Sequence, residues 1–247
     1  MNQSLSGKTA LVIGGSRGIG AAIVERLAAD GADVAFTYVR QTDAAADVSA
    51  LIVERGRQAL AIKADSVDPV AVTDAVEQVV TTFGRLDILV VNAGDFPIGP
   101  FDEFGVDDFD RTIAVNVRAA FFASQAAARH MNDGSRVVYI GSNVAERTVF
   151  TGFVLYALSK TALIGLTKGL ARDLGPRGIT VNLVHPGPTM TDLNPADGPD
   201  AEMIKAFTAL GRFADPAEIA GTVAHLVGDD GRYITGSAIH VDGGFGA

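Results

Sequence analysis

The fold class follows from one segment near the N-terminus, Thr9-Ala10-Leu11-Val12-Ile13-Gly14-Gly15-Ser16-Arg17-Gly18-Ile19-Gly20. Its apolar opening, residues 9–13, predicts a short strand that is buried on both faces. Glycines follow at once and lead into a helical pattern that we expect over residues 18–30. At such a junction, glycines permit a tight turn and let backbone amides at the start of the helix approach a pyrophosphate. The glycine spacing is wider than Gly-x-Gly-x-x-Gly, but the position between a strand and a helix indicates a dinucleotide site.

The rest of the chain alternates short apolar runs with longer helical patterns. Further strands are predicted at residues 33–38, 58–63, 86–91, 136–140, 179–184 and 238–241. Helices are predicted at residues 42–55, 68–83 and 106–131, over the segment that ends near residue 174, and after Asp215-Pro216. Seven strands separated by helices predict an α/β fold: a doubly wound parallel sheet with helices on both faces. No linker or repeat divides the chain, so we expect a single domain over residues 1–247.

One irregular segment interrupts this alternation. It spans residues 186–211 and contains four prolines and a polar run. Within a compact domain, a segment of this length is usually functional, and we expect a substrate lid at about 188–211. The alternative is a disordered surface insertion.

Tyr156 and Lys160 stand four residues apart in a predicted helix. This spacing places both side chains on one helical face. Because an ammonium beside a phenol favours the phenolate, the sequence predicts that the pKa of Tyr156 falls from about 10 toward neutrality. Such a tyrosine can exchange a proton with an alcohol oxygen near physiological pH. On spacing alone, an ordinary exposed pair of side chains is the competing interpretation.

Composition and charge exclude several classes of function. The 247 residues include no Cys, so neither a disulfide framework nor thiolate chemistry is expected. The formal net charge of −9 disfavours nucleic acid as a partner, and the four His lack metal-ligand spacing, so we expect no metal site. No apolar stretch approaches the length of a membrane span, and the N-terminus lacks the apolar core of a signal peptide. We therefore expect a cytoplasmic protein that binds a small molecule and not a membrane.

The end of the second predicted strand indicates which dinucleotide binds. An acid at this position would bind the adenosine ribose of NAD, but the chain has Tyr38, Val39 and Arg40 instead. Arg17 and Arg40 together are suited to a 2′-phosphate, which predicts NADP(H) as the cofactor. The alternative is that both arginines are merely solvated.

With the glycine turn, Tyr156 and Lys160 in this order, the chain resembles the short-chain dehydrogenase/reductase family along its whole length. It is most similar to the bacterial 3-oxoacyl-[acyl-carrier-protein] reductase type, whose ending matches Tyr233-Ile234-Thr235-Gly236 and Val241-Asp242-Gly243-Gly244. The resemblance implies a Rossmann-like fold, a nicotinamide cofactor, oxidoreduction between alcohols and carbonyls, and a homotetramer. The chain departs from the family pattern at two turns, where Ile13 replaces a usual Thr and Val91 replaces a usual Asn.

The resemblance also implies a catalytic set: Asn116, Ser142, Tyr156 and Lys160. In this scheme Ser142 binds the substrate carbonyl, and Tyr156 donates a proton as hydride arrives from the nicotinamide. Lys160 lowers the pKa of the tyrosine and binds the nicotinamide ribose, and Asn116 holds a water that relays protons. The expected cofactor contacts, besides Tyr156 and Lys160, are Gly14, Ser16, Arg17, Gly18, Ile19, Gly20, Tyr38, Arg40, Asp65, Ser66, Asn92, Ala93, Gly94, Pro186, Gly187 and Thr189.

The substrate is less closely specified. Phe96, Phe150, Phe153 and Leu193 could form an apolar pocket beside the nicotinamide, although ordinary core or interface positions would explain them equally well. Arg147 is the candidate partner for a substrate carboxylate. We expect an NADPH-dependent reductase that converts a ketone with an apolar body to a secondary alcohol. Two alternatives remain: an alcohol dehydrogenase that works oxidatively, and a non-catalytic NADP-binding sensor.

Overall fold

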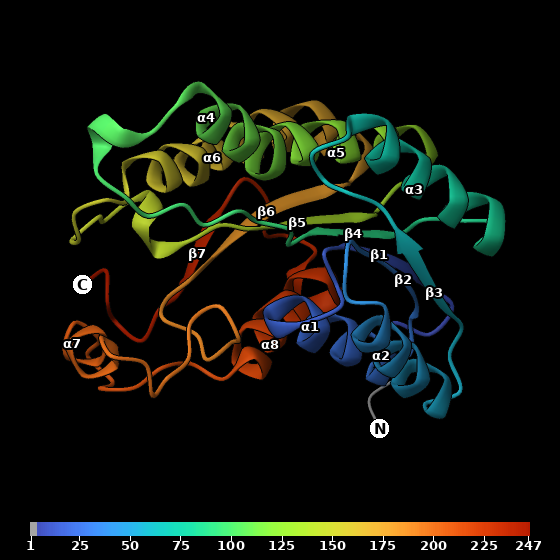
Figure 1. Ribbon diagram of the computed structural model, residues 1–247. Helices are drawn as coiled ribbons and strands as arrows, with labels where there is room; N and C mark the ends of the chain where they lie inside the picture. Colours follow the sequence, from blue (N-terminus) through green and yellow to red (C-terminus); the bar gives the residue numbers. More distant parts are fainter. Residues whose placement is uncertain (1–3) are drawn as a thin grey trace.

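Seven parallel strands form one sheet in the order β3-β2-β1-β4-β5-β6-β7. The computed structural model describes residues 4–247 (Figure 1). Its strands are β1 (Thr9–Ile13), β2 (Asp33–Tyr38), β3 (Ala59–Lys63), β4 (Ile88–Val91), β5 (Arg136–Ile140), β6 (Thr180–Pro186) and β7 (Ala238–Val241). All seven predicted strands are present, with boundaries within two residues of those expected. The predicted Rossmann-like, doubly wound fold in a single domain is confirmed.

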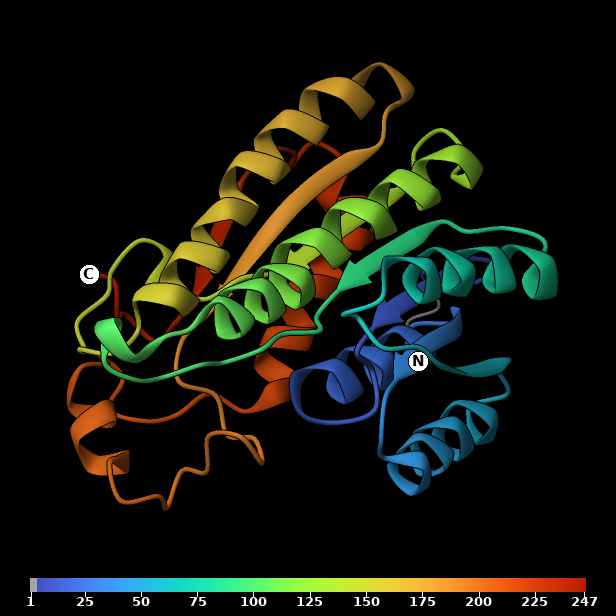
Figure 2. The same cartoon turned by 45° about the horizontal axis from the view of Figure 1, so that its top comes forward.

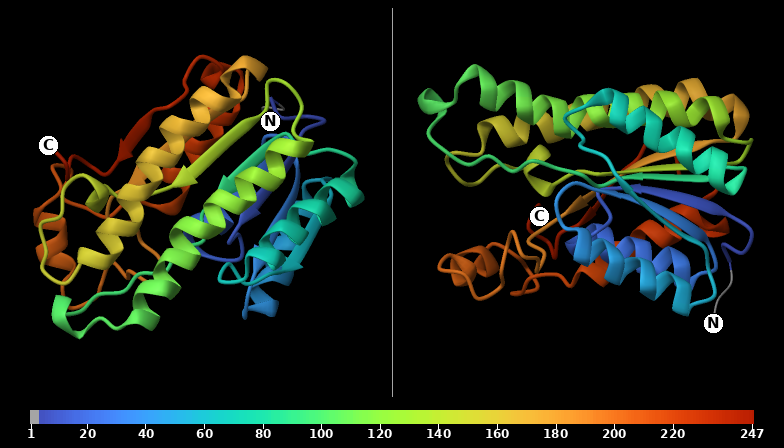
Figure 3. Two further views of the ribbon diagram at one scale, coloured as in Figure 1. Left: turned by 90° about the horizontal axis from the view of Figure 1, so that it is seen from above. Right: turned by 45° about the vertical axis from the view of Figure 1, so that its right-hand side comes forward.

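Helices cover both faces of the sheet. One face carries α3 (Pro69–Phe83), α4 (Val106–Ile113), α5 (Ala119–His130) and α6 (Val154–Leu174) (Figure 1). The opposite face carries α1 (Gly18–Ala29), α2 (Thr42–Glu54) and α8 (Pro216–Val227), and the right-hand view of Figure 3 shows the sheet between the two layers. None of these helices, nor any other in the described chain, combines the length and apolar character that a membrane span requires.

Two apolar layers hold the helices to the sheet, and β1 contributes to both. Leu11 and Ile13 pack into the layer under α3, α5 and α6, whereas Ala10 and Val12 pack into the layer under α1, α2 and α8. All four side chains are fully buried, as the apolar run predicts for a central parallel strand. Burying one large aliphatic side chain contributes about 1.5–3 kcal/mol, so β1 anchors both helical layers.

The helical stretch predicted over residues 106–131 is present from Val106 to His130, but it is not α-helical throughout. A π-helical stretch, Ala114–Arg118, separates α4 from α5. Such stretches insert an extra residue into an α-helix and are frequent at functional sites. Asn116, one of the residues expected to be catalytic, lies inside this stretch. The predicted helical stretch is confirmed, but its periodicity did not indicate the π-helical turn, because periodicity does not report the tertiary hydrogen bonds that this asparagine makes.

The order of the strands positions the site. From the centre of the sheet, β1 to β3 follow one another toward one side, and β4 to β7 follow one another toward the other side. The loops after β1 and β4 therefore lead in opposite directions at the carboxyl edge of the sheet. Ligands of open α/β sheets bind in the crevice that forms at such a point. The segment between β6 and α8, which includes the short helix α7 (Ala201–Ala206), extends beyond the carboxyl end of β6 (Figure 2).

Candidate active site

A cavity of about 810 Å³ runs along the carboxyl edge of the sheet. Its lining begins at the glycine turn after β1 and continues past the ends of β2 to β6 as far as residues of the predicted lid. Every residue expected at the site contributes to this lining except Gly20 and Asn116. Thr191, Asp192 and Ile204 of the predicted lid also line the cavity. Other lining residues were not predicted from the sequence, among them Asp95, Arg111, Val115, Asn143 and Phe245.

Gly20 lies behind the cavity and closes the turn. An added Cβ at this position would overlap the carbonyl oxygen of Gly14, so only glycine fits. The same carbonyl accepts a hydrogen bond of 2.7 Å from the side-chain amide of Asn92, which follows β4. The backbone amides of Asn92 and Ala93 also donate to the carbonyl of Ile13, at 3.0 and 2.8 Å. The turns therefore close although residues 13 and 91 depart from the family pattern.

The N-terminus of α1 is suited to an anion. Arg17 is its N-cap residue, and no side chain caps the free amides of the first turn, which also holds no acid. Free amides and the helix dipole together favour a phosphate at this position. Arg17 and Arg40 are exposed at the same end of the cavity, and neither forms an ion pair with another side chain of residues 4–247. Both are thus available for an anionic group.

Tyr156 and Lys160 lie on one face of α6, as their spacing predicts. The ammonium of Lys160 is 5.8 Å from the centroid of the Tyr156 ring and donates a hydrogen bond of 3.0 Å to the carbonyl oxygen of Ile140. Lys160 is only 4% exposed, and this burial lowers the pKa of Lys160 to about 8.

The predicted downward shift of the Tyr156 pKa was wrong. Burial raises the pKa of Tyr156 to about 12, and the opposing hydrogen bond with Ser142 does not compensate. The spacing of Tyr156 and Lys160 was correct, but the ammonium is directed at the end of β5 and the phenol is desolvated. The Tyr156 hydroxyl is therefore protonated at neutral pH.

Ser142 follows β5 and begins the short helix η3 (Asn143–Ala145). Within this turn its hydroxyl makes only long hydrogen bonds, donating to Oδ1 of Asn143 and accepting from the amide of Val144, both at 3.4 Å. The same hydroxyl faces the Tyr156 hydroxyl across the cavity. The backbone amide of Ser142 donates a hydrogen bond of 3.0 Å to Nδ1 of His185. The residue is thus held mainly through its backbone, which leaves its hydroxyl available to a ligand.

Asn116 lies behind the cavity lining. Its side-chain carbonyl accepts a hydrogen bond of 2.7 Å from the amide of Asp95, and its amide group donates to the carbonyl of Asp95 at 2.9 Å. The same amide group donates to the hydroxyl of Ser159 at 2.8 Å. These bonds tie the π-helical stretch both to the loop after β4 and to α6.

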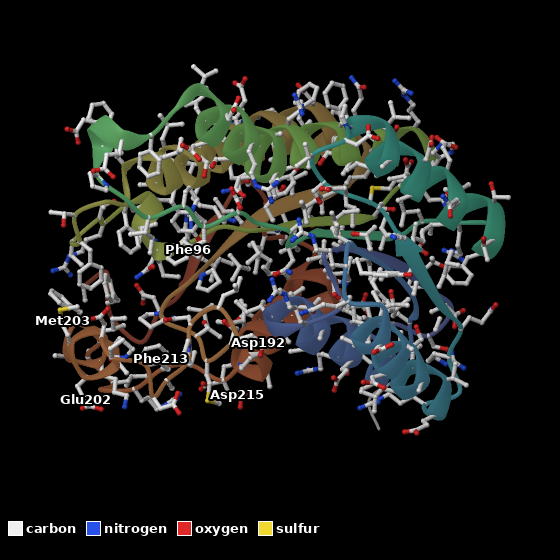
Figure 4. All side chains as sticks on the ribbon, viewed as in Figure 1. Phe96, Asp192, Glu202, Met203, Phe213 and Asp215 are labelled. Atoms are coloured by element: carbon white, nitrogen blue, oxygen red, sulfur yellow. The ribbon has the colours of Figure 1, made fainter. Side chains whose placement is uncertain are left out.

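Aromatic side chains form a continuous wall beside Tyr156. The ring of Phe96 meets the ring of Tyr156 edge-on, with centroids 4.5 Å apart, and also contacts Phe153. From Phe153 the contacts continue through Phe150 to Phe207 and Phe245. Figure 4 shows Phe96 above the region of α7, which carries Met203. Phe207 and Phe245 belong to this wall although no sequence pattern links them to the pocket.

Arg147, the candidate partner for a substrate carboxylate, is already occupied by other groups. Its guanidinium donates hydrogen bonds of 2.7 Å to the carbonyl oxygens of Phe245 and Ala247. The side chain thereby fastens the C-terminal tail, and with it the ring of Phe245, against the site. The described residues, 4–247, contain no group of three or more His, Cys, Asp or Glu arranged to hold a metal ion.

Comparisons with known proteins agree with this geometry. A family model described as enoyl-(acyl carrier protein) reductase matches residues 13–246. A short-chain dehydrogenase/reductase from Serratia marcescens is 56% identical, with a TM-score of 0.97 over 99% of this chain and 100% of that chain. A short chain dehydrogenase from Burkholderia cenocepacia, solved in complex with NADP, is 56% identical, with a TM-score of 0.98 over the same shares.

A relative with a different name matches equally far along the chain. The cyclic-di-GMP-binding biofilm dispersal mediator protein of Escherichia coli is 48% identical over 244 residues, which are 99% of each chain. Fold, motifs and relatives lead to one assignment: the chain belongs to the short-chain dehydrogenase/reductase family.

Proposed function

We propose that the protein is an NADPH-dependent reductase that converts a ketone to a secondary alcohol. The observation that carries this proposal is the convergence of Ser142, Tyr156 and Lys160 on one cavity that begins at the glycine turn. The three come from two parts of the fold: Ser142 follows the end of β5, and Tyr156 and Lys160 lie in the first two turns of α6. Such a convergence of a proton donor, a polar anchor and a cation is what carbonyl reduction requires.

The residues along the cavity fit NADP(H). The free amides of α1 suit the pyrophosphate, and Arg17 and Arg40 supply positive charge for a 2′-phosphate. The Burkholderia cenocepacia relative was solved with NADP bound, which supports the same choice for this chain. When bound, the nicotinamide supplies the hydride. Asp65 and Ser66 would then border the adenine, and the turn at Pro186, Gly187 and Thr189 would border the nicotinamide.

The proton chemistry follows from the side chains. The Ser142 hydroxyl donates a hydrogen bond to the substrate carbonyl and fixes its angle. Tyr156 then donates its proton to the oxygen of the carbonyl as the alcohol forms. Because the pKa of Tyr156 is about 12 without ligands, the hydroxyl holds its proton at neutral pH, which suits a proton donor. Lys160, with a pKa of about 8, retains most of its charge at pH 7 and favours the phenolate that the transfer creates.

The aromatic wall favours a ketone with an apolar body. Phe96, Phe150, Phe153 and Leu193 all border the cavity, and Phe245 extends the wall from the C-terminal tail. Arg147, the candidate for a substrate carboxylate, is instead occupied by backbone carbonyls. We therefore propose that hydrophobic contact, and not pairing with Arg147, holds the substrate beside Tyr156.

We also propose that residues 188–211 act as a lid. Thr189, Thr191, Leu193 and Ile204 of this segment border the cavity, and the side chain of Leu193 is 60% exposed. Closure over a bound cofactor would remove such apolar surface from water. We expect NADPH to slow limited proteolysis within residues 188–211 while cleavage elsewhere is unchanged. Equal cleavage rates with and without NADPH would contradict a lid.

Assembly into a homotetramer is proposed as well. Exposed apolar side chains at Val106, Phe121 and Leu158, on α4, α5 and α6, are candidates for burial between subunits. The mass of the protein in solution tests this part of the proposal.

A panel of ketones with NADPH, followed at 340 nm and including an acetoacetyl thioester, tests the function. We expect turnover of ketones with an apolar body, and we expect Tyr156→Phe to lower kcat by about a thousandfold because the proton donor is lost. NADPH affinity should change little, since the phenol ring remains. NADPH fluorescence gives the affinity, and the 340 nm assay gives kcat. Retained turnover in Tyr156→Phe would overturn the mechanism.

Two other functions are distinguished by the same panel. Faster oxidation of alcohols with NADP⁺ than reduction of the matching ketones, at cellular cofactor ratios, would favour an oxidative dehydrogenase. If no ketone in the panel is reduced but NADPH still binds, the result would favour a non-catalytic sensor. The name of the Escherichia coli relative gives this sensor a specific ligand to test, cyclic di-GMP, by competition with NADPH.

A further inference from the structure

His185 lies in β6 directly behind Ser142. Its side chain is fully buried, and β6 pairs with β5, the strand that leads to Ser142. Nδ1 of His185 accepts the hydrogen bond of 3.0 Å from the backbone amide of Ser142. Because Nδ1 is the acceptor, the neutral ring carries its proton on Nε2.

The ring is also pressed against the residue before Ser142. A Cβ added to Gly141 would lie 2.5 Å from Nδ1 and 2.8 Å from Cε1 of His185, so the imidazole occupies the space that a side chain would need. The two residues that precede Ser142, Ile140 and Gly141, are held by backbone hydrogen bonds that do not involve His185. Gly141 donates to the carbonyl of Val184 at 2.7 Å, and Lys160 donates to the carbonyl of Ile140 at 3.0 Å. The backbone amide of Ser142 is held by His185, and its carbonyl accepts a hydrogen bond of 3.0 Å from the amide of Ala145 within the turn.

The other edge of the ring faces the far end of the same turn. Nε2 of His185 has no hydrogen-bond partner among residues 4–247 and lies 3.9 Å from a carboxylate oxygen of Glu146, the residue that follows η3. The second carboxylate oxygen of Glu146 lies 3.1 Å from Nε2 of His240 in β7. His185 thus contacts the start of the turn from Ser142 to Glu146 and approaches its end.

We propose that His185 is a positioning residue that sets where the Ser142 hydroxyl meets the substrate carbonyl. The inference rests on the proposed function of Ser142. The bonds that the hydroxyl makes within its own turn are long, at 3.4 Å, so its location follows from the Ser142 backbone, and the imidazole holds the amide of that backbone. Without the acceptor, the buried amide of Ser142 is unpaired and the turn shifts to find another partner.

Two variants of nearly equal size separate this role from packing. His185→Asn and His185→Leu leave similar space, but only the asparagine offers an oxygen close to the position of Nδ1. We expect His185→Leu to lower kcat for ketone reduction by about tenfold to a hundredfold, as misplacement of a reacting group does, and His185→Asn to recover most of that loss. His185→Phe fills the ring volume without an acceptor and should behave like His185→Leu. His240→Gln, which alters the neighbouring ring without touching Ser142, is the control and should retain kcat.

A readout that does not require turnover accompanies the kinetics. The Ser142 amide proton resonance, measured with isotope-labelled protein, should lie downfield in the wild type and in His185→Asn and should move upfield in His185→Leu and His185→Phe. NADPH affinity should be similar in all of them. Failure of the whole ketone panel would remove the proposed function, whereas the amide resonance would still report the bond to His185.

Three results would overturn the positioning role. The first is wild-type kcat in His185→Leu or His185→Phe. The second is an equal loss in His185→Asn and His185→Leu, because that indicates packing alone. The third is a Ser142 amide shift that does not distinguish the variants. If His185→Leu does not fold, the comparison of His185→Phe with His185→Asn decides between the same outcomes.

Discussion

At the scale of single residues, burial outweighs proximity in setting the charge state of the site. Lys160 stands one helical turn from Tyr156, yet its ammonium donates to the carbonyl of Ile140 and lies 5.8 Å from the tyrosine ring. Desolvation therefore dominates both side chains: it raises the pKa of Tyr156 to about 12 and lowers the pKa of Lys160 to about 8. Both shifts favour the neutral form of each group.

We propose that single residues also decide the choice between NADPH and NADH. We expect Arg40→Ala to weaken NADPH binding by about tenfold or more, since a charge-assisted hydrogen bond to a phosphate contributes about 1.5–3 kcal/mol. NADH, which lacks the 2′-phosphate, should bind nearly as before. Titration of cofactor fluorescence measures both affinities.

Arg55→Ala serves as the control for that experiment. Arg55 donates to the carbonyl of Leu51 at the end of α2 and does not line the cavity, so its loss removes a similar charge from elsewhere on the surface. A loss of NADH affinity equal to the loss of NADPH affinity in Arg40→Ala would contradict recognition of the 2′-phosphate. Equal catalytic efficiency of the wild type with both cofactors would do the same.

At the scale of elements, the π-helical stretch links three parts of the fold. Asn116 projects from it to hold both backbone groups of Asp95, in the loop after β4, and the hydroxyl of Ser159 in α6. Asp95 directly precedes Phe96, whose ring contacts Tyr156. The stretch therefore positions one wall of the cavity although Asn116 itself does not line it.

Removing the side-chain amide of Asn116 should weaken the connection between the π-helical stretch, the loop after β4 and α6. We expect Asn116→Ala to lower the free energy of unfolding by about 1–3 kcal/mol, because the buried hydroxyl of Ser159 and the half-buried backbone groups of Asp95 lose their partners. Urea denaturation measures the change, and the exposed Asn132→Ala, whose side chain makes no hydrogen bond within residues 4–247, should stay within about 0.5 kcal/mol of the wild type. We also expect kcat to fall, since the loop that carries Phe96 moves. Unchanged stability would mean that these bonds are not maintained in solution.

At the scale of the whole molecule, β5, β6, β7 and the turn after β5 meet around one buried histidine. Burial, the neighbouring His240 and the ammonium of Lys160 lower the pKa of His185 to about 4, while Glu146 acts in the opposite direction. An unfolded chain would bind a proton at this ring near pH 6.5. Between about pH 6.5 and pH 4 the unfolded state therefore binds more protons at residue 185, and acid destabilises the fold.

Comparison of the wild type with His185→Asn isolates the contribution of the His185 pKa to the pH dependence of stability. As the pH falls from 6.5 to 4, we expect the free energy of unfolding of the wild type to decrease by about 3 kcal/mol more than that of the variant. Above pH 6.5 the two curves should run parallel, because both folded and unfolded states then carry a neutral group at residue 185. Chemical denaturation at a series of pH values gives both curves. Parallel curves down to pH 4 would exclude a depressed pKa at His185.

The sheet, its helical layers and most of the lining of the cavity could be predicted from the sequence. The strands at residues 9–13 and 33–38 and the turn from Gly14 to Gly20 are local features, since hydrophobic periodicity and glycine requirements depend on near neighbours along the chain. Four features emerged only from the folded molecule: the protonation of Tyr156, the π-helical stretch around Asn116, the place of Phe245 in the aromatic wall and the bond from Ser142 to His185. Each of these depends on contact or burial between segments far apart in sequence, and local patterns carry no information about such contacts.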